Sequence, residues 1–468
     1  MNLLDRDALE ISALLEAREL SAEELMKATL KRIDAVNGKV NAIVSLRDRE
    51  TLIAEARKAD NTPRRGWLHG MPLAVKDLAN VAGIETSMGS PIMAGQVAKQ
   101  DSVFVSRMRR AGGLFIGKTN TPEFGLGSHT FNPVHGHTHN PYDLSKSAGG
   151  SSGGAAAALA SRMLSVTDGS DMMGSLRNPA AWCNVYGFRP SWGRVPADPE
   201  NEMFLHQLST NGPMGRSPSD IAALLEVQSG WDSSQPHGFL PEIFLDRLMG
   251  DLAFARIGWL GDWGGAYAME DGVMQTCTKA LKSFERMGSI VEEIAPPFPA
   301  DQIWDAWITL RSWSIAAKLG PLLETHRDEL KPEAIWEIER GLKLSAMEVN
   351  RASVVRSQWF RKAAELFEDY DLLVMPSAQV WPFPVEKRYP KSIAGRSMDT
   401  YHRWMEVVVP VSLIGLPCLS APVGFGENGL PMGLQLIGPA RGDLRVLQLG
   451  QAWHEGTEFP AKHPPILE

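Results

Sequence analysis

Cysteine is scarce in this 468-residue chain, and the few that occur are scattered. Cys183, Cys277 and Cys418 lie far apart and form no CxxC pair. This spacing argues against a disulfide framework and a structural zinc site, and it is typical of proteins from a reducing compartment. We therefore expect the three cysteines to be small buried apolar residues.

Neither an export signal nor a membrane-spanning segment is predicted. Residues 1–10 include Asp5, Arg6, Asp7 and Glu10 where a signal peptide needs an apolar core. The uncharged run 407–425 has the length of a spanning helix, but prolines and glycines interrupt it. Such a run favours buried strands, the first at 407–411, broken by turns. We expect a cytoplasmic protein without a membrane partner.

Basic residues are also fewer than acidic ones. The 47 lysines and arginines are outnumbered by 55 aspartates and glutamates, which gives a net charge of -8. No basic run of the kind that follows a phosphate backbone is present, so nucleic acid is not an expected ligand. With 44% hydrophobic and 22% charged residues, the composition is that of an ordinary globular protein.

Residues 112–119 have the letters of a phosphate-binding loop without its expected structure. Gly112, Gly117, Lys118 and Thr119 match the pattern GxxxxGK[ST]. However, the inner residues Gly-Leu-Phe-Ile read as an apolar strand, whereas a phosphate loop needs a helix that begins at the lysine. We therefore exclude nucleotide binding.

Three alternating histidines, His135, His137 and His139, have a spacing that a metal ion could use on an extended segment. Only Asp143 lies near them in the sequence, so no ligand set is complete. We interpret them as polar loop residues and expect no metal.

The order of sequence patterns predicts one continuous domain with a helical insertion. Residues 1–60 read as helices, and Ser21 with Glu24 forms a capping box. Residues 61–195 carry short strands and helices, and 196–370 are mostly helical. Residues 371–468 return to strands around the hairpin turn Asn428-Gly429 and end in a helix. Five tryptophans of the helical region are expected to pack in its core: Trp304, Trp307, Trp313, Trp336 and Trp359.

The segment 148–189 carries the two hydroxyls that matter most for function. Ser151 follows one glycine pair and precedes another, and Ser175 follows Gly174. Glycine lets backbone and hydroxyl groups come close to a reacting atom. We expect 168–174 to be a loop and Ser175 to begin a helix, so that loop N–H groups point at its hydroxyl, as an oxyanion site requires.

Three charged residues complete the candidate site. Lys76 ends the apolar run 71–75, where an ammonium group is costly unless it is paired or deprotonated. From these residues alone we interpret Lys76 as a structural or solvent-directed lysine in preference to a catalytic one. Asp171 and Arg177 flank Ser175, and we expect them to pair and brace the loop.

Several motifs, taken in order, resemble the amidase signature family. They are GMPLAVKD at 70–77, GKTNTPEFGLG at 117–127, AGGSSGG at 148–154, SDMMGSLRNPA at 170–180 and the closing GLPMGLQLIGP at 429–439. The resemblance extends over essentially the whole chain and is weakest in the helical insertion. It implies a single large α/β domain with a mixed central β-sheet surrounded by helices. It also implies a hydrolase that acts on a small linear amide and needs no cofactor.

The resemblance also implies residue roles. Ser175 would be the nucleophile, Lys76 the base and Ser151 the serine between them. Burial can lower the pKa of a lysine by about 3–5 units, which would allow a neutral amine. The oxyanion hole would be formed by the N–H groups of Met172, Met173, Gly174 and Ser175. The substrate pocket would include Gly125, Leu126, Gly127 and Met173.

One residue departs from the family pattern. Where the family usually has glycine, two residues before the nucleophile, this chain has Met173. A methionine N–H can still donate, but glycine-only dihedral angles would be strained. We hypothesise that Met173 narrows the pocket mouth and leaves the hole intact.

Other functions remain open from the sequence. Gly149, Ser151 and Gly153 spell GxSxG, and His454 follows late enough to complete the triad order of an α/β-hydrolase esterase. The chain also fits the glutaminase component of an amidotransferase, or a binding protein that kept the fold and lost the chemistry. The sequence leaves open a homodimer and the identity of the amide.

Overall fold

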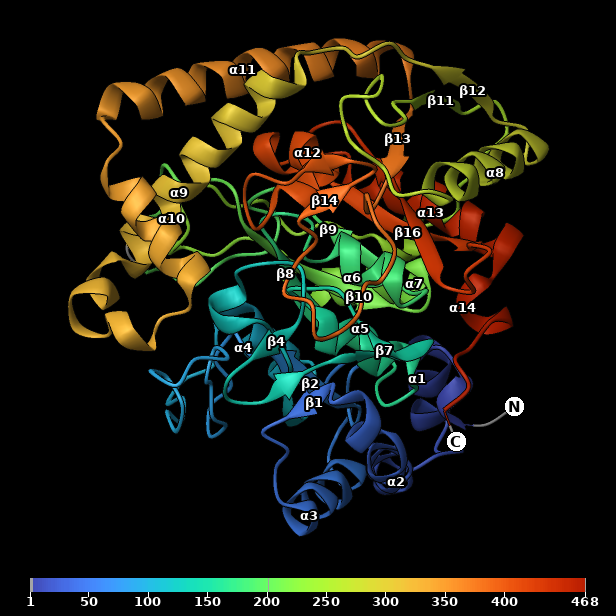
Figure 1. The fold of residues 1–468 in the computed structure, drawn as a ribbon. Coiled ribbons are helices and arrows are strands. Elements are labelled where there is room, and N and C mark those ends of the chain that lie inside the picture. The colour runs from blue at the N-terminus through green and yellow to red at the C-terminus, as the bar shows by residue number, and fades with distance from the viewer. Residues whose placement is uncertain (1–2, 201, 468) are drawn as a thin grey trace.

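A mixed eight-stranded sheet forms the centre of the computed structural model, which describes residues 3–200 and 202–467 (Figure 1). The strand order is β12-β11-β13-β17-β16-β9-β10-β8. β11 pairs in parallel with β12 and β13, and the other neighbours pair antiparallel. The strands are β8 Val166–Asp171, β9 Tyr186–Arg189, β10 Thr210–Gly215, β11 Arg256–Trp259, β12 Ile290–Glu293, β13 Leu372–Pro376, β16 Cys418–Phe425 and β17 Pro431–Ile437. The predicted mixed central sheet is therefore confirmed.

A smaller sheet in the order β1-β3-β2 lies next to β8. Its strands are β1 Ile43–Val44, β2 Pro72–Lys76 and β3 Leu114–Thr119. The Thr167 hydroxyl of β8 donates to the Ala74 carbonyl of β2 at 2.8 Å. This contact brings the end of β2, with Lys76, beside the end of β8.

The N-terminal region is helical, as predicted. It contains α1 Ala8–Glu16, α2 Ala22–Val40 and α3 Arg49–Asp60, with α2 and α3 below the smaller sheet in Figure 1. At the start of α2 the Glu24 N–H donates to the Ser21 hydroxyl at 3.1 Å, and the Ser21 N–H donates to the Glu24 carboxylate at 2.9 Å. The predicted capping box is confirmed.

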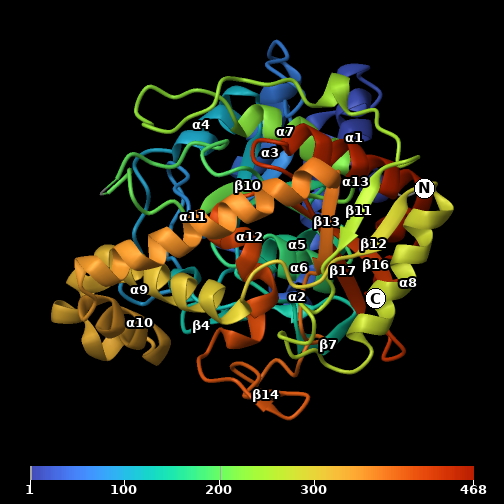
Figure 2. The same ribbon diagram turned by 90° about the horizontal axis from the view of Figure 1, so that it is seen from above.

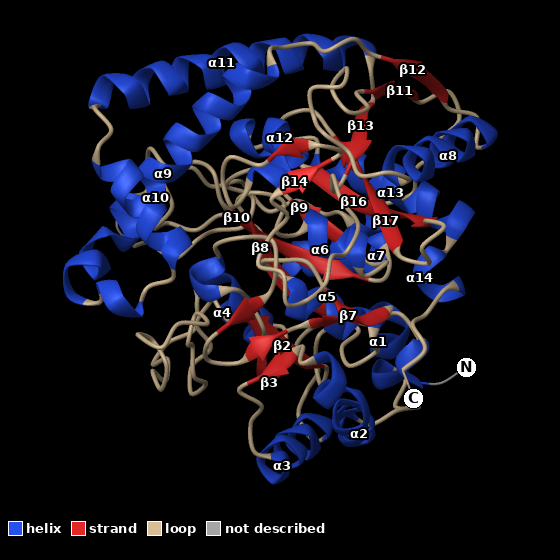
Figure 3. Cartoon of the chain, in the orientation of Figure 1, coloured by secondary structure: helices blue, strands red, loops and turns tan. Residues whose placement is uncertain are grey.

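Helices surround the sheets, as the secondary-structure colouring shows (Figure 3). α6 packs against β9, β16 and β17, while α7 contacts β10 and α13 contacts β16. The bounds of these and the neighbouring helices are α4 Val103–Arg110, α5 Gly153–Ala160, α6 Arg177–Trp182, α7 Pro218–Gln228, α8 Val273–Arg286, α13 Asp443–Thr457 and α14 Phe459–Lys462. The remaining short strands are β4 Phe131–Asn132, β5 Gly136–His137, β6 His139–Asn140, β7 Asp143–Ser147, β14 Ser392–Ile393 and β15 Arg396–Ser397.

Three consecutive helices form a lobe at one end of the molecule, visible in both ribbon views (Figures 1 and 2). They are α9 Ala300–Thr325, α10 Pro332–Leu342 and α11 Ala346–Asp369. Trp304, Trp307 and Trp359 are buried among them or against the core, whereas Trp336 is 37% exposed. The tryptophan prediction therefore holds for most of the set.

The predicted strand at 407–411 is wrong. This segment is helical, with a 3-10 helix at Arg403–Val408 followed by α12 at Val409–Ile414. Pro410 lies in the first turn of α12, where its missing N–H costs nothing, and Gly415 ends the helix with φ 67°. The valine-rich composition of 407–411 is typical of a strand, which explains the wrong prediction. No helix in the described part of the chain is long and apolar enough to span a bilayer.

Candidate active site

A cavity of about 850 Å³ lies where the two sheets meet the helical lobe, and Lys76, Ser151 and Ser175 all line it. The four residues expected in the substrate pocket also line it: Gly125, Leu126, Gly127 and Met173. One face of α9 forms a further wall, through Arg311, Ser314, Ile315, Lys318 and Leu319.

Lys76 is 1% exposed and is surrounded by hydroxyl groups. Its Nζ lies 2.7 Å from Ser151 Oγ, 2.8 Å from Ser152 Oγ, 3.0 Å from Ser170 Oγ and 3.3 Å from the Ser170 carbonyl oxygen. Within residues 3–200 and 202–467 no carboxylate forms an ion pair with this amine. The amine is therefore placed to exchange a proton with a serine.

Burial lowers the pKa of Lys76 to about 7, and the charges of Asp168 and Asp171 oppose this shift without cancelling it. The Lys76 backbone N–H donates to Asp168 Oδ1 at 3.1 Å, so this carboxylate lies beside the backbone at the end of β2. A large fraction of the amine is consequently neutral near pH 7.

Ser151 lies in the glycine-rich turn before α5, and the Gly150–Ser151 peptide bond is cis. The turn packs closely against its neighbours. A Cβ at Gly153 would lie 2.3 Å from Thr130 Oγ1, and one at Gly154 would lie 2.3 Å from the Asn120 backbone nitrogen. These two glycines are the first residues of α5, and the close approach of their neighbours excludes a side chain at either position.

Ser175 lies in the short turn between β8 and α6. The structure corrects the predicted loop at 168–174, because β8 continues to Asp171 and α6 begins at Arg177. The left-handed conformation in this turn falls on Gly174, with φ 79°, and not on Met173. Met173 therefore occupies its position without the backbone strain of a glycine-only conformation.

The predicted oxyanion donors differ in availability. The Gly174 N–H donates to Asp171 Oδ1 at 2.9 Å, and the Leu176 N–H donates to Asp171 Oδ2 at 3.1 Å. Gly174 is therefore engaged within the chain. This leaves the N–H groups of Met172, Met173 and Ser175 as the more available donors of the predicted four.

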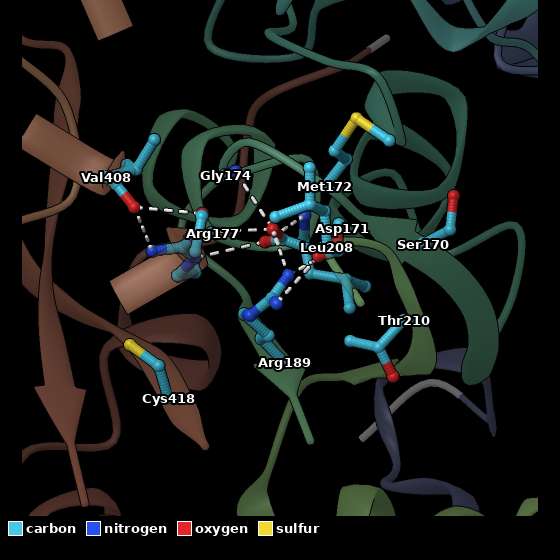
Figure 4. A network of polar contacts seen from close by, with 12 residues as sticks. Ser170, Asp171, Met172, Gly174, Arg177, Arg189, Leu208, Thr210, Val408 and Cys418 are labelled. Carbon is cyan, nitrogen blue, oxygen red and sulfur yellow. Dashed lines mark hydrogen bonds and ion pairs between the residues drawn. The ribbon is translucent and has the colours of Figure 1, made fainter. Parts of the chain in front are cut away.

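Asp171 and Arg177 form a buried ion pair that includes Arg189 (Figure 4). Arg177 Nη2 lies 3.0 Å from Asp171 Oδ1, and Arg189 Nη1 lies 3.0 Å from the same atom. Burial alone would raise the pKa of Asp171, but the two guanidinium groups hold it well below its ordinary value. Arg177 also donates to the Val408 carbonyl at 3.1 Å and to Gln435 Oε1 at 2.6 Å. The turn is thereby fixed to β17 and to the segment before α12.

The segment with the GxxxxGK[ST] pattern forms a strand, as predicted, and not a phosphate-binding loop. Lys118 lies in β3, and its amine contacts the Ala79 carbonyl, Thr86 Oγ1 at 3.1 Å and Asp77 Oδ1 at 3.6 Å. No helix begins at this lysine.

The histidines do not assemble a metal site. The described residues contain no group of three or more His, Cys, Asp or Glu side chains placed to hold a metal ion. His135 Nε2 lies 3.1 Å from the Ser87 hydroxyl, and His139 Nδ1 lies 2.7 Å from the Leu144 carbonyl oxygen. His454, the candidate third member of an esterase triad, lies 3.2 Å from the Tyr186 hydroxyl. The basic neighbour of Ser151 is therefore Lys76.

Arg311 is a cavity residue that the sequence does not reveal. It is a single arginine within a helix, without a motif or a characteristic spacing. Its partners Glu337 and Tyr401 lie far away in the sequence, so only the fold brings them together.

Known proteins resemble this chain in sequence and in structure. The sequence model of the Amidase family matches residues 24–447. An acylamidase from Rhodococcus erythropolis is 33% identical over 474 residues, which cover 99% of this chain and 98% of that protein. A glutamyl-tRNA(Gln) amidotransferase subunit from Thermus thermophilus is 34% identical over 486 residues, which cover 98% and 99%. The crystal structure of a bacterial aryl acylamidase of the amidase signature enzymes superposes with a TM-score of 0.90 at 27% identity, covering 98% of this chain and 99% of that one.

Proposed function

Because the chain belongs to the Amidase family of amidase signature enzymes and is a hydrolase of amide carbon–nitrogen bonds, we propose that it acts through an acyl-enzyme on Ser175. Lys76 is the base in this proposal, and Ser151 transfers the proton between them. The observation that carries the proposal is the 2.7 Å distance from Lys76 Nζ to Ser151 Oγ in a cavity that Ser175 also lines.

In the first half-reaction the neutral Lys76 amine takes the proton of the Ser151 hydroxyl, which takes the proton of Ser175 at the same time. Ser175 Oγ then forms a bond to the amide carbon. The negative charge that develops on the carbonyl oxygen is stabilised by the N–H groups of Met172, Met173 and Ser175. Preorganised donors of this kind act without reorganisation at the moment of reaction.

The tetrahedral intermediate then breaks its carbon–nitrogen bond. The proton held by Lys76 returns through Ser151 to the nitrogen, so that a neutral amine or ammonia departs. In the second half-reaction water loses a proton along the same path and attacks the acyl carbon. The carboxylic acid leaves, and Ser175 regains its proton.

Trapping the acyl-enzyme tests the proposal. An activated ester or a fluorophosphonate should add one acyl or phosphonyl group to the intact protein, and peptide mapping should locate it on Ser175. Ser175→Ala should take up no label. A label on Ser151 that persists in Ser175→Ala would instead indicate an esterase that uses the GxSxG serine, and would overturn the proposal.

A second candidate function is the glutaminase reaction of an amidotransferase. It is favoured by the similarity to a glutamyl-tRNA(Gln) amidotransferase subunit over nearly the whole chain. Release of ammonia from glutamine that depends on added partner proteins would support this function. Hydrolysis of simple anilides by the isolated protein, with no activity on glutamine, would exclude it.

A further inference from the structure

The cavity wall contains one buried cation whose hydrogen bonds are unevenly satisfied. Arg311 of α9 lines the cavity and its side chain is 4% exposed. Its Nε donates to Glu337 Oε1 at 2.7 Å and its Nη2 donates to the Tyr401 hydroxyl at 2.9 Å. Among the described residues, its Nη1 donates only to the thioether sulfur of Met172, at 3.3 Å. A thioether is a weak acceptor, so Nη1 is the donor that a better acceptor would take.

The charge of Arg311 is already balanced. Glu337 is fully buried, pairs with Arg311, and lies on the side of the guanidinium group formed by Nε. The carboxylates of Asp168, Asp198, Glu200 and Glu202 also line the cavity, together with the amines of Lys76 and Lys318. A second carboxylate at Arg311 would add negative charge to a cavity in which carboxylates already outnumber the lysines, which is unfavourable.

Apolar side chains supply an adaptable part of the cavity lining. Methionine side chains are frequent in the lining: Met88, Met93, Met172, Met173, Met203 and Met405. Unbranched thioether side chains adjust to groups of different shape. Ile315 and Leu319 continue the apolar wall along the same face of α9 as Arg311.

We propose that Arg311 Nη1 forms a substrate subsite for a neutral oxygen acceptor, such as an ether or carbonyl oxygen, carried by an otherwise apolar group of the amide. The oxygen takes the position of the Met172 sulfur on Nη1, and the methionine side chain moves against the apolar group. The subsite deepens the proposed amidase function and rests on it. It defines the preferred substrate as an amide with an apolar group that contains one uncharged acceptor.

The test compares three matched series of anilides. In the first the acyl group is a hydrocarbon, in the second one methylene is replaced by an ether or ketone oxygen at successive positions, and in the third the group ends in a carboxylate. Wild-type enzyme should favour the best oxygen-containing amide over its hydrocarbon match by about 10- to 100-fold in kcat/KM, the range expected for a hydrogen bond to a charged donor.

Arg311→Lys should bring the ratio of kcat/KM between the oxygen-containing amide and its hydrocarbon match close to one. Lysine keeps the charge opposite Glu337 but lacks the second guanidinium nitrogen. The double variant Arg311→Met with Glu337→Met should do the same without leaving a buried charge unpaired. Thermal unfolding of both variants checks that they fold. Arg327→Lys is the control, at an exposed arginine that pairs with Glu339 and does not line the cavity, and it should keep the wild-type ratio.

The outcomes are distinguishable. Equal losses on the oxygen-containing and hydrocarbon amides would mean that Arg311 acts by holding Met172, which overturns the subsite. A preference for the carboxylate series, or no preference for oxygen in the wild type, also overturns it while leaving the amidase function intact. Failure of the wild type to hydrolyse any of the anilides or the corresponding primary amides would remove both.

Discussion

Lys76 Nζ and Ser151 Oγ lie 2.7 Å apart, and the other polar contacts of this amine are also with serine oxygens. A lysine paired with a carboxylate would be held in the charged form. Here the amine contacts serine oxygens, Asp168 and Asp171 act on it only through space, and burial lowers its pKa to about 7. The same environment that removes the charge therefore also supplies the hydroxyl that would receive or deliver the proton.

The first prediction concerns pH. Below its pKa the Lys76 amine is protonated and cannot accept a proton, so kcat/KM on a neutral amide should rise as the pH increases, with a midpoint at about 7. Lys76→Arg should be inactive over the whole range because a guanidinium stays protonated. A flat profile in the wild type would contradict the role of Lys76 as a neutral base.

The second prediction separates two adjacent serines. Ser151 and Ser152 both contact Lys76 Nζ, but only Ser151 lines the cavity. Ser151→Ala should lower kcat by about 100- to 10,000-fold, the usual range for a proton-transfer group. Ser152→Ala should lower kcat by less than about tenfold, since it removes a contact and not the path. Steady-state kinetics and thermal unfolding of both variants check this, and equal losses would argue against a relay through Ser151.

The third prediction concerns the buried ion pair. Asp171→Asn leaves the buried Arg177 and Arg189 without their counter-charge, and should lower the free energy of unfolding by about 3–5 kcal/mol. Asp34→Asn is the matched control. Its pair with Arg49 is exposed, so the change should cost less than about 1 kcal/mol. Denaturant unfolding measures both. Similar small losses would mean that Asp171 does not brace the turn.

The fourth prediction concerns Met173, which is 3% exposed and lines the cavity. Met173→Gly removes a side chain beside Ser175, so kcat/KM should shift towards bulkier acyl groups by about tenfold relative to acetyl. Met249→Gly, at a position 94% exposed, serves as the control and should leave selectivity unchanged. A series of anilides with acyl groups of increasing size measures the shift. Unchanged selectivity in Met173→Gly would remove a role for Met173 in shaping the pocket.

Local signals in the sequence were reliable where short-range physics decides the structure. The capping box at Ser21 and Glu24 is satisfied within four residues, and the Asn428-Gly429 turn joins β16 to β17, with Gly429 at φ 73°. These features depend on few neighbours, so their patterns predicted them correctly.

Elsewhere tertiary contacts decided the structure. The valines at 407–409 suggested a strand, yet the segment is helical. The Val408 carbonyl accepts a hydrogen bond from Arg177, and the Val407 N–H donates to Gln379 at 3.0 Å. These contacts come from distant parts of the chain and outweigh the weak strand preference of β-branched residues.

The candidate site divides in the same way. Glycines mark the two serines in the sequence, whereas the role of Lys76 came only from the resemblance to the family. Which N–H groups of the turn are free, and that Arg311 reaches the cavity, follow only from the fold. Gly174 is engaged by Asp171, and Arg311 is held by Glu337 and Tyr401.

The walls of the cavity come from different parts of the chain, and this has an evolutionary consequence. The residues of the proposed proton path lie on β2 and on the turns before α5 and after β8, whereas α9 contributes its wall from the three-helix lobe. Substitutions in the three-helix lobe can therefore change which amides the enzyme accepts, while the residues of the proposed proton path stay the same. A library confined to the cavity face of α9 should accordingly alter selectivity while leaving the proposed proton path unchanged.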